Sequence, residues 1–470
     1  MQSIIIVSTG ILAALAAYVL AVNVGTHNDV GVLLLAISLG LTTAAMCHSI
    51  LQRGGAVLLI VSTYLTAFFL FPGILHASRN AYPFFGMTYN PNDVTNAAIV
   101  VLLFVAFFII GVVSANRRRE APTNQPQTQP RLMKRSFNWA LILLSLAMIA
   151  VIGPSQFLAR RADGIELALQ QEAGLMVMAF ARALPVIAVA ATLHRILITR
   201  RSVANLTQLF FAGAALFVAN YPVAVPRFVL FGVMLTLAPL ILDFTSRMFK
   251  TLFAVAALIG LGTIFPLMSH LQRGAEDSVF TFDILEYYMN SPDLDGFQST
   301  INATMLVSDT GLRWGWQVLS AAFFFVPRSI WPSKGERTGA IAAEHAGYDY
   351  FNISSPLPSE IYVDFGYLGC IFGGFLIGYA AQRLDRTYVS SKNRHSLRKY
   401  LMFGGIFGYT IIVFRGPLLG IAGPVALYFV LAYIASASMF LDRFPRRRAG
   451  VRSMTPAKVL RRRVTFSPIP

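Results

Sequence analysis

Charged residues are scarce in this 470-residue chain, at 13% of the sequence, whereas 56% of the residues are hydrophobic. Soluble domains carry about a quarter charged residues, and disordered chains carry few apolar ones, so both classes are excluded. The only two cysteines, Cys47 and Cys370, lie inside apolar stretches, which excludes a disulfide framework and a thiolate metal site. The sequence also offers no zinc, Walker A, nucleophile-elbow or Rossmann motif in a supporting context.

What the chain has in abundance is long apolar runs, which predict an all-α polytopic membrane protein. A helix needs about 20 apolar residues to cross the hydrocarbon core. Twelve segments qualify, some marginally, at 3–22, 30–48, 55–75, 95–115, 138–153, 175–197, 204–219, 224–242, 251–268, 366–383, 400–415 and 419–441. The first has no basic leader before it, which favours a retained span over a cleaved signal.

The net charge of +17 suggests nucleic acid at first sight, but the distribution of the charges follows membrane topology. With the amino terminus in the cytoplasm, the cytoplasmic loops hold 27 of the 38 basic residues, and the outside holds 17 of the 21 acidic ones. This bias predicts that both termini are cytoplasmic and that nucleic acid is not a partner. The predicted divisions are nine spans in 1–268, an outside loop at 269–365, three spans in 366–441 and a basic tail at 442–470.

The outside loop contains a short apolar stretch at 314–327, which ends at Pro327 and Arg328. A run of 10–14 apolar residues is typical of a re-entrant or interfacial element rather than of a span. Counting this stretch as a thirteenth span would also place the basic tail outside. The loop is therefore predicted to carry a re-entrant or interfacial helix.

Four arginines are predicted near the outer ends of spans. Only 15 uncharged residues follow Arg227 before Asp243, and 15 precede Arg415 after Lys399, so both arginines are drawn into the outer leaflet. Arg182 lies inside its own span, and Arg328 ends the short apolar stretch. Because the guanidinium fork suits phosphate oxygens, the four predict a cationic pocket for the diphosphate of a lipid carrier.

The alternative for each arginine is snorkelling, in which the side chain reaches the head groups and binds nothing else. Snorkelling accounts less well for all four together, because the spans that follow Arg227 and precede Arg415 have too few apolar residues.

Acidic and aromatic side chains crowd the outside loop. Aromatic faces with carboxylates commonly form sugar-binding surfaces, but the same composition fits a solvated acidic loop with interfacial anchors. The residues are Glu276, Asp277, Asp283, Glu286, Tyr287, Tyr288, Asp293, Asp295, Asp309, Trp314, Trp316, Trp331, Glu344, Tyr348, Asp349, Tyr350, Glu360, Tyr362 and Asp364.

Two carboxylate pairs stand out in this loop. Glu360 and Asp364 are four residues apart and would share one helix face, where a carboxylate could accept the proton of a sugar hydroxyl. Asp293 and Asp295 form a DxD triplet of the kind that holds a metal in nucleotide-sugar transferases. The triplet is common by chance, and an outside location argues against nucleotide sugars, so no metal is predicted.

Several segments resemble the Wzy-type oligosaccharide repeat-unit polymerases, also called O-antigen or capsule polymerases. The two most specific are 325–334 (FVPRSIWPSK) and 355–369 (SPLPSEIYVDFGYLG), and three weaker ones are 220–228 (NYPVAVPRF), 293–297 (DLDGF) and 414–417 (FRGP). The resemblance covers mainly residues 220–417. Members usually have Asn where this chain has Asp364, so a role for Asp364 is less secure than one for Glu360.

The resemblance implies a bacterial inner-membrane glycosyltransferase of the GT-C type that polymerises undecaprenyl-diphosphate-linked units at the periplasmic face without a metal or another cofactor. Arg227, Arg328 and Arg415 would bind the diphosphate and stabilise its departure. Glu360 would deprotonate the acceptor, and Asp293, Asp295, Tyr348 and Tyr350 would line the glycan path. Further substrate-binding candidates are Arg182, Lys334 and Tyr362, and a chain-length regulator is an expected partner.

Two other functions remain open at this point. A lipid-linked oligosaccharide flippase or transporter would place titratable residues through the bilayer midplane and would show paired repeats, whereas these charges cluster at one side and no repeat is visible. An O-antigen ligase also has many spans and a long periplasmic loop, but it moves a finished chain to the lipid A core.

Overall fold

The computed structural model is almost entirely helical, and it describes residues 2–25, 28–52, 54–117, 131–159, 172–199, 201–273, 284–391 and 396–443. The loop carboxylates Glu276, Asp277 and Asp283 lie outside the described residues, as do the polar linker at 122–130 and the tail from residue 444.

Nine helical runs in the described part of the chain are long and apolar enough to cross a membrane. The third of them, Val57–Arg79, consists of α3 (Val57–Tyr64), the π-helical turn η1 (Leu65–Leu70) and α4 (Phe71–Arg79). The others are α1 (Gln2–Val24), α2 (Asp29–Leu51), α5 (Pro91–Arg117), α6 (Arg135–Ile152), α8 (Glu172–Thr199), α17 (Leu357–Ser391), α18 (Leu397–Arg415) and α19 (Leu418–Ala435). The predicted class, an all-α polytopic membrane protein, is confirmed.

The other three predicted spans are shorter or interrupted. Helices α9 (Val203–Ala219) and α10 (Arg227–Ile241) are apolar but have 17 and 15 residues. The segment predicted at 251–268 is divided at Thr263 between α11 (Arg247–Gly262) and α12 (Ile264–Arg273). Since α11 alone has 16 residues, it covers only about 24 Å. Of the twelve segments predicted, some of them as marginal, these three therefore fall short of the usual length.

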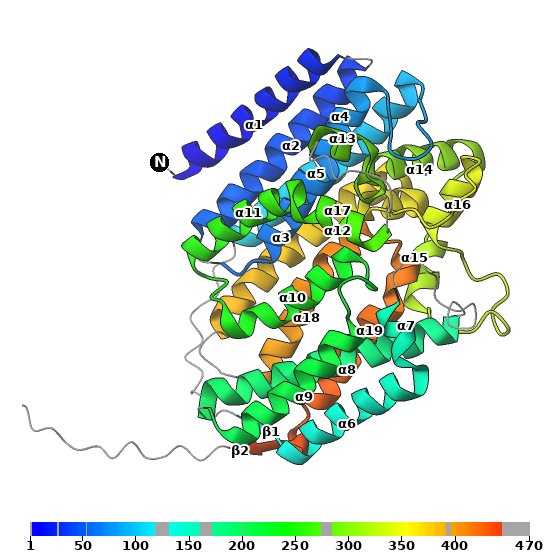
Figure 1. Cartoon of the computed structure of the whole chain (residues 1–470). Helices are drawn as coiled ribbons and strands as arrows, with labels where there is room; N and C mark the ends of the chain where they lie inside the picture. Colours follow the sequence, from blue (N-terminus) through cyan, green and yellow to red (C-terminus); the bar gives the residue numbers. More distant parts are fainter. Residues whose placement is uncertain are drawn as a thin grey trace, which may run out of the picture.

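Helices α10 and α18 pack closely against each other in the bundle (Figure 1). Gly232 and Thr236 of α10 meet Gly408 and Gly404 of α18, so these two helices run antiparallel. A Cβ atom at Gly408 would overlap the Thr236 hydroxyl and the Gly232 carbonyl, which explains the glycine there. The pair brings the first residue of α10 and the last residue of α18, both arginines, to the same end of the bundle.

Gly408→Ala is expected to lower the thermal unfolding temperature of the purified protein by several degrees, because overpacking costs about 1–3 kcal/mol. Gly213→Ala in α9 is the matched control, since no atom lies within 4 Å of a Cβ built there. Equal unfolding temperatures for the two variants in detergent would contradict the close α10–α18 contact.

Short elements gather at the end where the two arginines lie. They are α13 (Ile284–Asn290), η4 (Pro292–Leu294), α14 (Gly296–Thr310), α15 (Trp316–Ala322) and α16 (Thr338–His345). The stretch at 314–327 contains only the seven-residue α15, which is too short to cross a membrane, and it is not among the nine long apolar runs. Whether it is interfacial or re-entrant stays a prediction.

Helix α17 begins nine residues earlier than the predicted span, at Leu357, and it is broken at Gly366. Gly366 has φ 62° and ψ −153°, a conformation that suits glycine because it has no Cβ atom. The break at Gly366 thus sets off residues 357–365 as a separate helical piece of α17, and this piece carries both Glu360 and Asp364.

At the opposite end of the bundle, buried charges cap helix termini. Asp385 accepts hydrogen bonds from the backbone N–H groups of Val57 and Leu58, at 2.7 and 3.1 Å. Lys250 donates to the carbonyls of Ser49 and Gln52, at 2.7 and 3.1 Å. These charges satisfy backbone groups that lack a partner within their own helix, on either side of the short connection between α2 and α3.

The same end holds an antiparallel pair of strands, β1 (Arg131–Met133) and β2 (Leu441–Arg443). The short helices α7 (Pro154–Leu158) and η6 (Ser438–Phe440) complete the fold.

Candidate functional site

Two arginines from different helices pair with the two carboxylates of one loop. Arg227 at the start of α10 forms an ion pair with Asp293 and donates to the Phe265 carbonyl at 2.6 Å. Arg415 at the end of α18 approaches Asp295 at 3.5 Å. Two of the four arginines of the predicted pocket therefore meet the predicted DxD segment in one cluster, here called the Arg–Asp cluster (Arg227, Arg415, Asp293, Asp295).

Aromatic rings form the floor of the Arg–Asp cluster. The Arg415 guanidinium lies 4.6 Å from the Phe228 ring centroid, and that of Arg227 lies 5.6 Å from Phe265. The Phe68 ring contacts both of these rings, at 5.4 and 5.1 Å. An apolar floor excludes water beneath the guanidinium groups and strengthens their interaction with anions.

The segment that precedes α17 joins the cluster to Glu360. The Ser354 N–H donates to Asp295 at 2.9 Å, and the Ser355 N–H donates to the Arg415 carbonyl at 3.2 Å. The same backbone then enters α17, where Glu360 lies in the first turn. Three stretches that are far apart in sequence thus converge at one end of the bundle.

Glu360 is buried, and both of its carboxylate oxygens have partners. The Thr338 hydroxyl donates to Oε2 at 2.8 Å, and the backbone N–H of Leu418, the first residue of α19, lies 3.3 Å from Oε1. The amino terminus of α19 favours a negative charge here. Glu360 therefore links α16, α17 and α19, and the Thr338 hydroxyl occupies one position from which an acceptor hydroxyl would donate to it.

Asp364 shares α17 with Glu360, as the spacing of four predicts, but its partners are different. Its two oxygens accept hydrogen bonds from the backbone N–H groups of Gln317 and Val318, at 3.1 and 2.8 Å. These amides belong to the first turn of α15, so Asp364 stabilises the start of that helix.

Arg328 and Lys334 are both engaged by the loop that follows α15. Arg328 donates to the carbonyls of Lys334 and Gly335 at 2.8 and 2.9 Å. The buried Lys334 ammonium donates to the carbonyls of Phe324 and Val326 at 2.7 and 3.1 Å. These hydrogen bonds connect the loop to itself. Both residues thus contact protein carbonyls, whereas the sequence predicts that they contact the substrate.

Arg182 lies nearly three turns into α8, inside a helix long enough to span the membrane, as predicted. Its carbonyl accepts a hydrogen bond from the Asn220 side chain at 3.2 Å. Asn220 begins the connection that leads to Arg227, so the backbone of Arg182 lies beside the approach to the Arg–Asp cluster.

The three predicted tyrosines occupy different environments. Tyr348 is buried, and its hydroxyl meets Tyr89, Gln298 and Asn302 at 2.8, 2.8 and 3.0 Å. Burial, followed by the neighbouring Tyr348 hydroxyl, raises the pKa of Tyr89 well above its ordinary value, so Tyr89 stays neutral. Tyr348 thus belongs to the interior, whereas the resemblance implies that it lines the glycan path. Tyr362 is buried against Tyr367, and Tyr350 is exposed.

Sequence reasoning missed Arg337 and Thr338. Thr338 is the partner of Glu360, and the exposed Arg337 precedes it. The Arg337 Cδ atom lies 3.3 Å from where a Cβ on Gly420 would stand, so its side chain lies across the first turn of α19. No spacing or motif relates residue 337 to residue 420, so this contact had no signal in the sequence.

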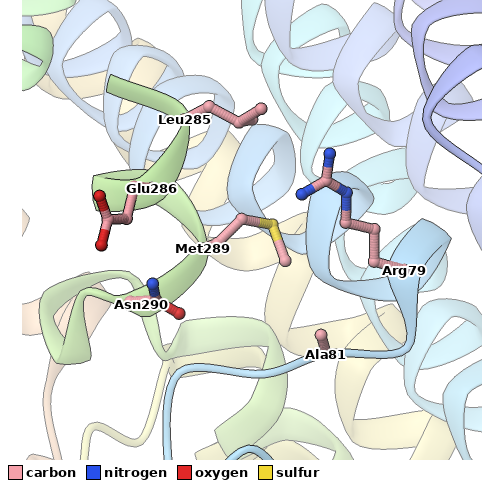
Figure 2. Close-up of a pocket in the computed structure, with 6 residues that line it drawn as sticks. All are labelled: Arg79, Ala81, Leu285, Glu286, Met289 and Asn290. Atoms are coloured by element: carbon pink, nitrogen blue, oxygen red, sulfur yellow. The ribbon is translucent and has the colours of Figure 1, made fainter. Parts of the chain in front are cut away.

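A shallow pocket of about 350 Å³ opens at the same end, between α4 and α13. Figure 2 shows Met289 of α13 extending toward Arg79 of α4 across this pocket. Its remaining lining residues are Ala81, Leu285, Glu286 and Asn290, so it is separate from the Arg–Asp cluster.

Within the described residues, no group of three or more His, Cys, Asp or Glu side chains is placed to hold a metal ion. The carboxylates of Asp293 and Asp295 have arginines as partners instead.

No family model matches the chain, and comparisons with curated proteins and with solved structures find no significant match. The helices define a multi-pass α-helical membrane protein, and its most distinctive polar features are the Arg–Asp cluster and the buried Glu360.

Proposed function

We propose that this chain is a glycosyltransferase that polymerises oligosaccharide repeat units carried on undecaprenyl diphosphate, at the periplasmic face of a bacterial inner membrane. The observation that carries the proposal is the pairing of Arg227 and Arg415 with Asp293 and Asp295 at one end of a membrane bundle, beside the buried Glu360. A lipid carrier keeps its tail in the bilayer and presents its diphosphate at that depth.

Arg415 is the member of the cluster with hydrogen-bonding capacity to spare. The Arg415 side chain is 26% exposed, and its Asp295 contact is long, at 3.5 Å. Its buried Nε atom has no hydrogen-bond partner among the described residues. A guanidinium with spare donors suits the two oxygens of a phosphate.

The charges of the four cluster residues cancel, so an incoming diphosphate requires additional positive charge. The exposed Arg337 supplies it in this proposal, because its side chain lies across the first turn of α19, close to the residues that follow Arg415. Fixed cations contribute most where negative charge develops, which is on the phosphate oxygen that leaves the donor sugar.

The proposed reaction is a substitution at the anomeric carbon of the donor. The acceptor hydroxyl oxygen bonds to that carbon, the bond from the carbon to the phosphate oxygen breaks, and undecaprenyl diphosphate departs. The hydroxyl proton passes to Glu360 once the acceptor has replaced the Thr338 hydroxyl. A chain-length regulator is the proposed protein partner.

Expression of this chain in a bacterial host that lacks its own repeat-unit polymerase, but makes the matching lipid-linked unit, is expected to restore a ladder of glycan lengths on a gel. Arg415→Ala is expected to abolish the ladder without loss of membrane-inserted protein, because the leaving diphosphate loses its main ligand. A single-unit product with the unchanged chain would contradict the polymerase. Transfer of preformed polymer to lipid A core in place of a ladder would indicate a ligase.

A further inference from the structure

Two exposed aromatic rings each lie next to the same buried ring, that of Phe84, at the end of the bundle that carries the Arg–Asp cluster. Phe85, in the connection between α4 and α5, is 58% exposed, and Tyr350, after α16, is 46% exposed. Each ring lies 6.2 Å from the ring of Phe84, at interplanar angles of 34° and 36°. Phe84 and Tyr348 are buried beneath them, and the Tyr348 ring lies 5.0 Å from that of Phe85.

Buried hydrogen bonds from α14 hold this aromatic group in place. The Gln298 side chain accepts from the Phe84 N–H at 2.9 Å and donates to the Phe84 carbonyl at 3.1 Å. The same amide donates to the Tyr348 hydroxyl, which also meets Tyr89. The buried rings of Phe84 and Tyr348 are therefore held by hydrogen bonds within the protein, and no bound ligand is needed to order them.

Phe85 adopts a backbone conformation that disfavours large side chains. Its φ is 58°, and Gly86 follows with a φ of 57°. A bulky residue in the left-handed region is strained, and such strain persists only where surrounding contacts maintain it. Here the Gln298 bonds to Phe84 maintain it, and the result is a ring that is left exposed instead of being buried with Phe84 and Tyr348.

The charges next to the exposed rings are negative. Asp349 is exposed between Tyr348 and Tyr350, and Glu344 is exposed near the end of α16. Asp309 lies 3.1 Å from His345, the last residue of α16. Carboxylates would repel an anionic lipid surface, but they accept hydrogen bonds from sugar hydroxyls. The C–H face of a pyranose ring, in turn, stacks on an aromatic face.

We propose that Phe85 and Tyr350 form a carbohydrate-binding platform that takes a pyranose ring of the glycan, with the Asp349 carboxylate accepting a hydroxyl hydrogen bond. The platform rests on the proposed function only for the identity of its glycan. The platform lies away from the reacting atoms, and it holds the glycan before or after the glycosidic bond is formed.

The direct test measures binding by the full-length protein in lipid nanodiscs. The probe is the repeat-unit oligosaccharide released by mild acid from the lipid carrier of the complemented host, titrated calorimetrically. The double variant Phe85→Ala/Tyr350→Ala is expected to raise Kd about tenfold, through loss of two stacking faces. The matched control is Phe217→Ala on α9, because Phe217 is also 58% exposed. Unchanged Kd in the double variant, or no binding by the unchanged protein, would overturn the platform.

The same proteins separate failure of the platform from failure of the proposed function. Oligosaccharide binding that depends on Phe85, in a protein that makes no ladder, refutes the polymerase and leaves the platform standing. If the double variant makes a ladder and also binds the probe normally, the platform is refuted and the polymerase stands.

A membrane-anchoring role for the rings gives a different result. Phe85→Trp, in a background with the four native tryptophans replaced by phenylalanine, is expected to fluoresce as a water-exposed residue. Quenching of that fluorescence by brominated phospholipids would place the ring in lipid and overturn the proposal.

Discussion

Glu360→Gln is expected to lower chain elongation by about 10²- to 10⁴-fold, the usual contribution of a general base. The amide has the shape of the carboxylate, and it still offers an oxygen to Leu418 and a hydrogen-bonding group to Thr338. It cannot take the acceptor's proton. Quantified glycan ladders, together with the amount of folded protein in the membrane, measure the two effects separately.

Glu336→Gln is the matched control, because this substitution makes the same chemical change at an exposed residue, two positions before Thr338. It is expected to elongate normally. If Glu360→Gln also retains normal elongation, Glu360 is a link between helices and not the base. If Glu360→Gln instead removes the folded protein from the membrane, the lost elongation reports folding, and the base assignment then depends on Glu360→Asp.

Arg227→Met is expected to destabilise the protein by about 3–5 kcal/mol, because it leaves Asp293 as a largely buried charge without its partner. The double variant Arg227→Met/Asp293→Leu is expected to recover most of that stability, since two apolar side chains replace the pair. It is not expected to recover elongation, because the diphosphate has lost a cation. Thermal unfolding and ladder assays on the same three proteins test both statements.

The Arg415 pair provides the comparison for this experiment. Its contact with Asp295 is longer and its arginine more exposed, so Arg415→Met is expected to lose less stability than Arg227→Met. A double variant at Arg227 and Asp293 that elongates normally would contradict a role for Arg227 in substrate binding.

The sequence predicts the helices well where a single physical property decides them. Uninterrupted apolar length predicts the nine long runs, and the short length of 314–327 correctly argues against a thirteenth span. It misses the start of α17, because the helix begins in a polar, proline-containing segment whose order depends on partners in α14, α15 and α19.

The site shows the same limit. Membrane energetics identifies Arg227 and Arg415 as expensive charges, and helical spacing places Glu360 and Asp364 together on α17. Their partners are a matter of tertiary structure: Asp293 is 66 residues from Arg227, and Asp295 is 120 residues from Arg415. The sequence identifies candidate charges because burying them in a membrane is energetically unfavourable. It does not show which carboxylate pairs with each arginine, because the partners are far apart along the chain.

The order of the paired residues along the chain has a consequence for biogenesis. Arg415 is synthesised after its partner Asp295, but Arg227 is synthesised 66 residues before Asp293. At a translation rate of about 5–20 residues per second, α10 emerges about 3–13 seconds before its counter-ion exists. Helix α10, already short at 15 residues, therefore begins membrane insertion before Asp293, the ion-pair partner of Arg227, has been translated.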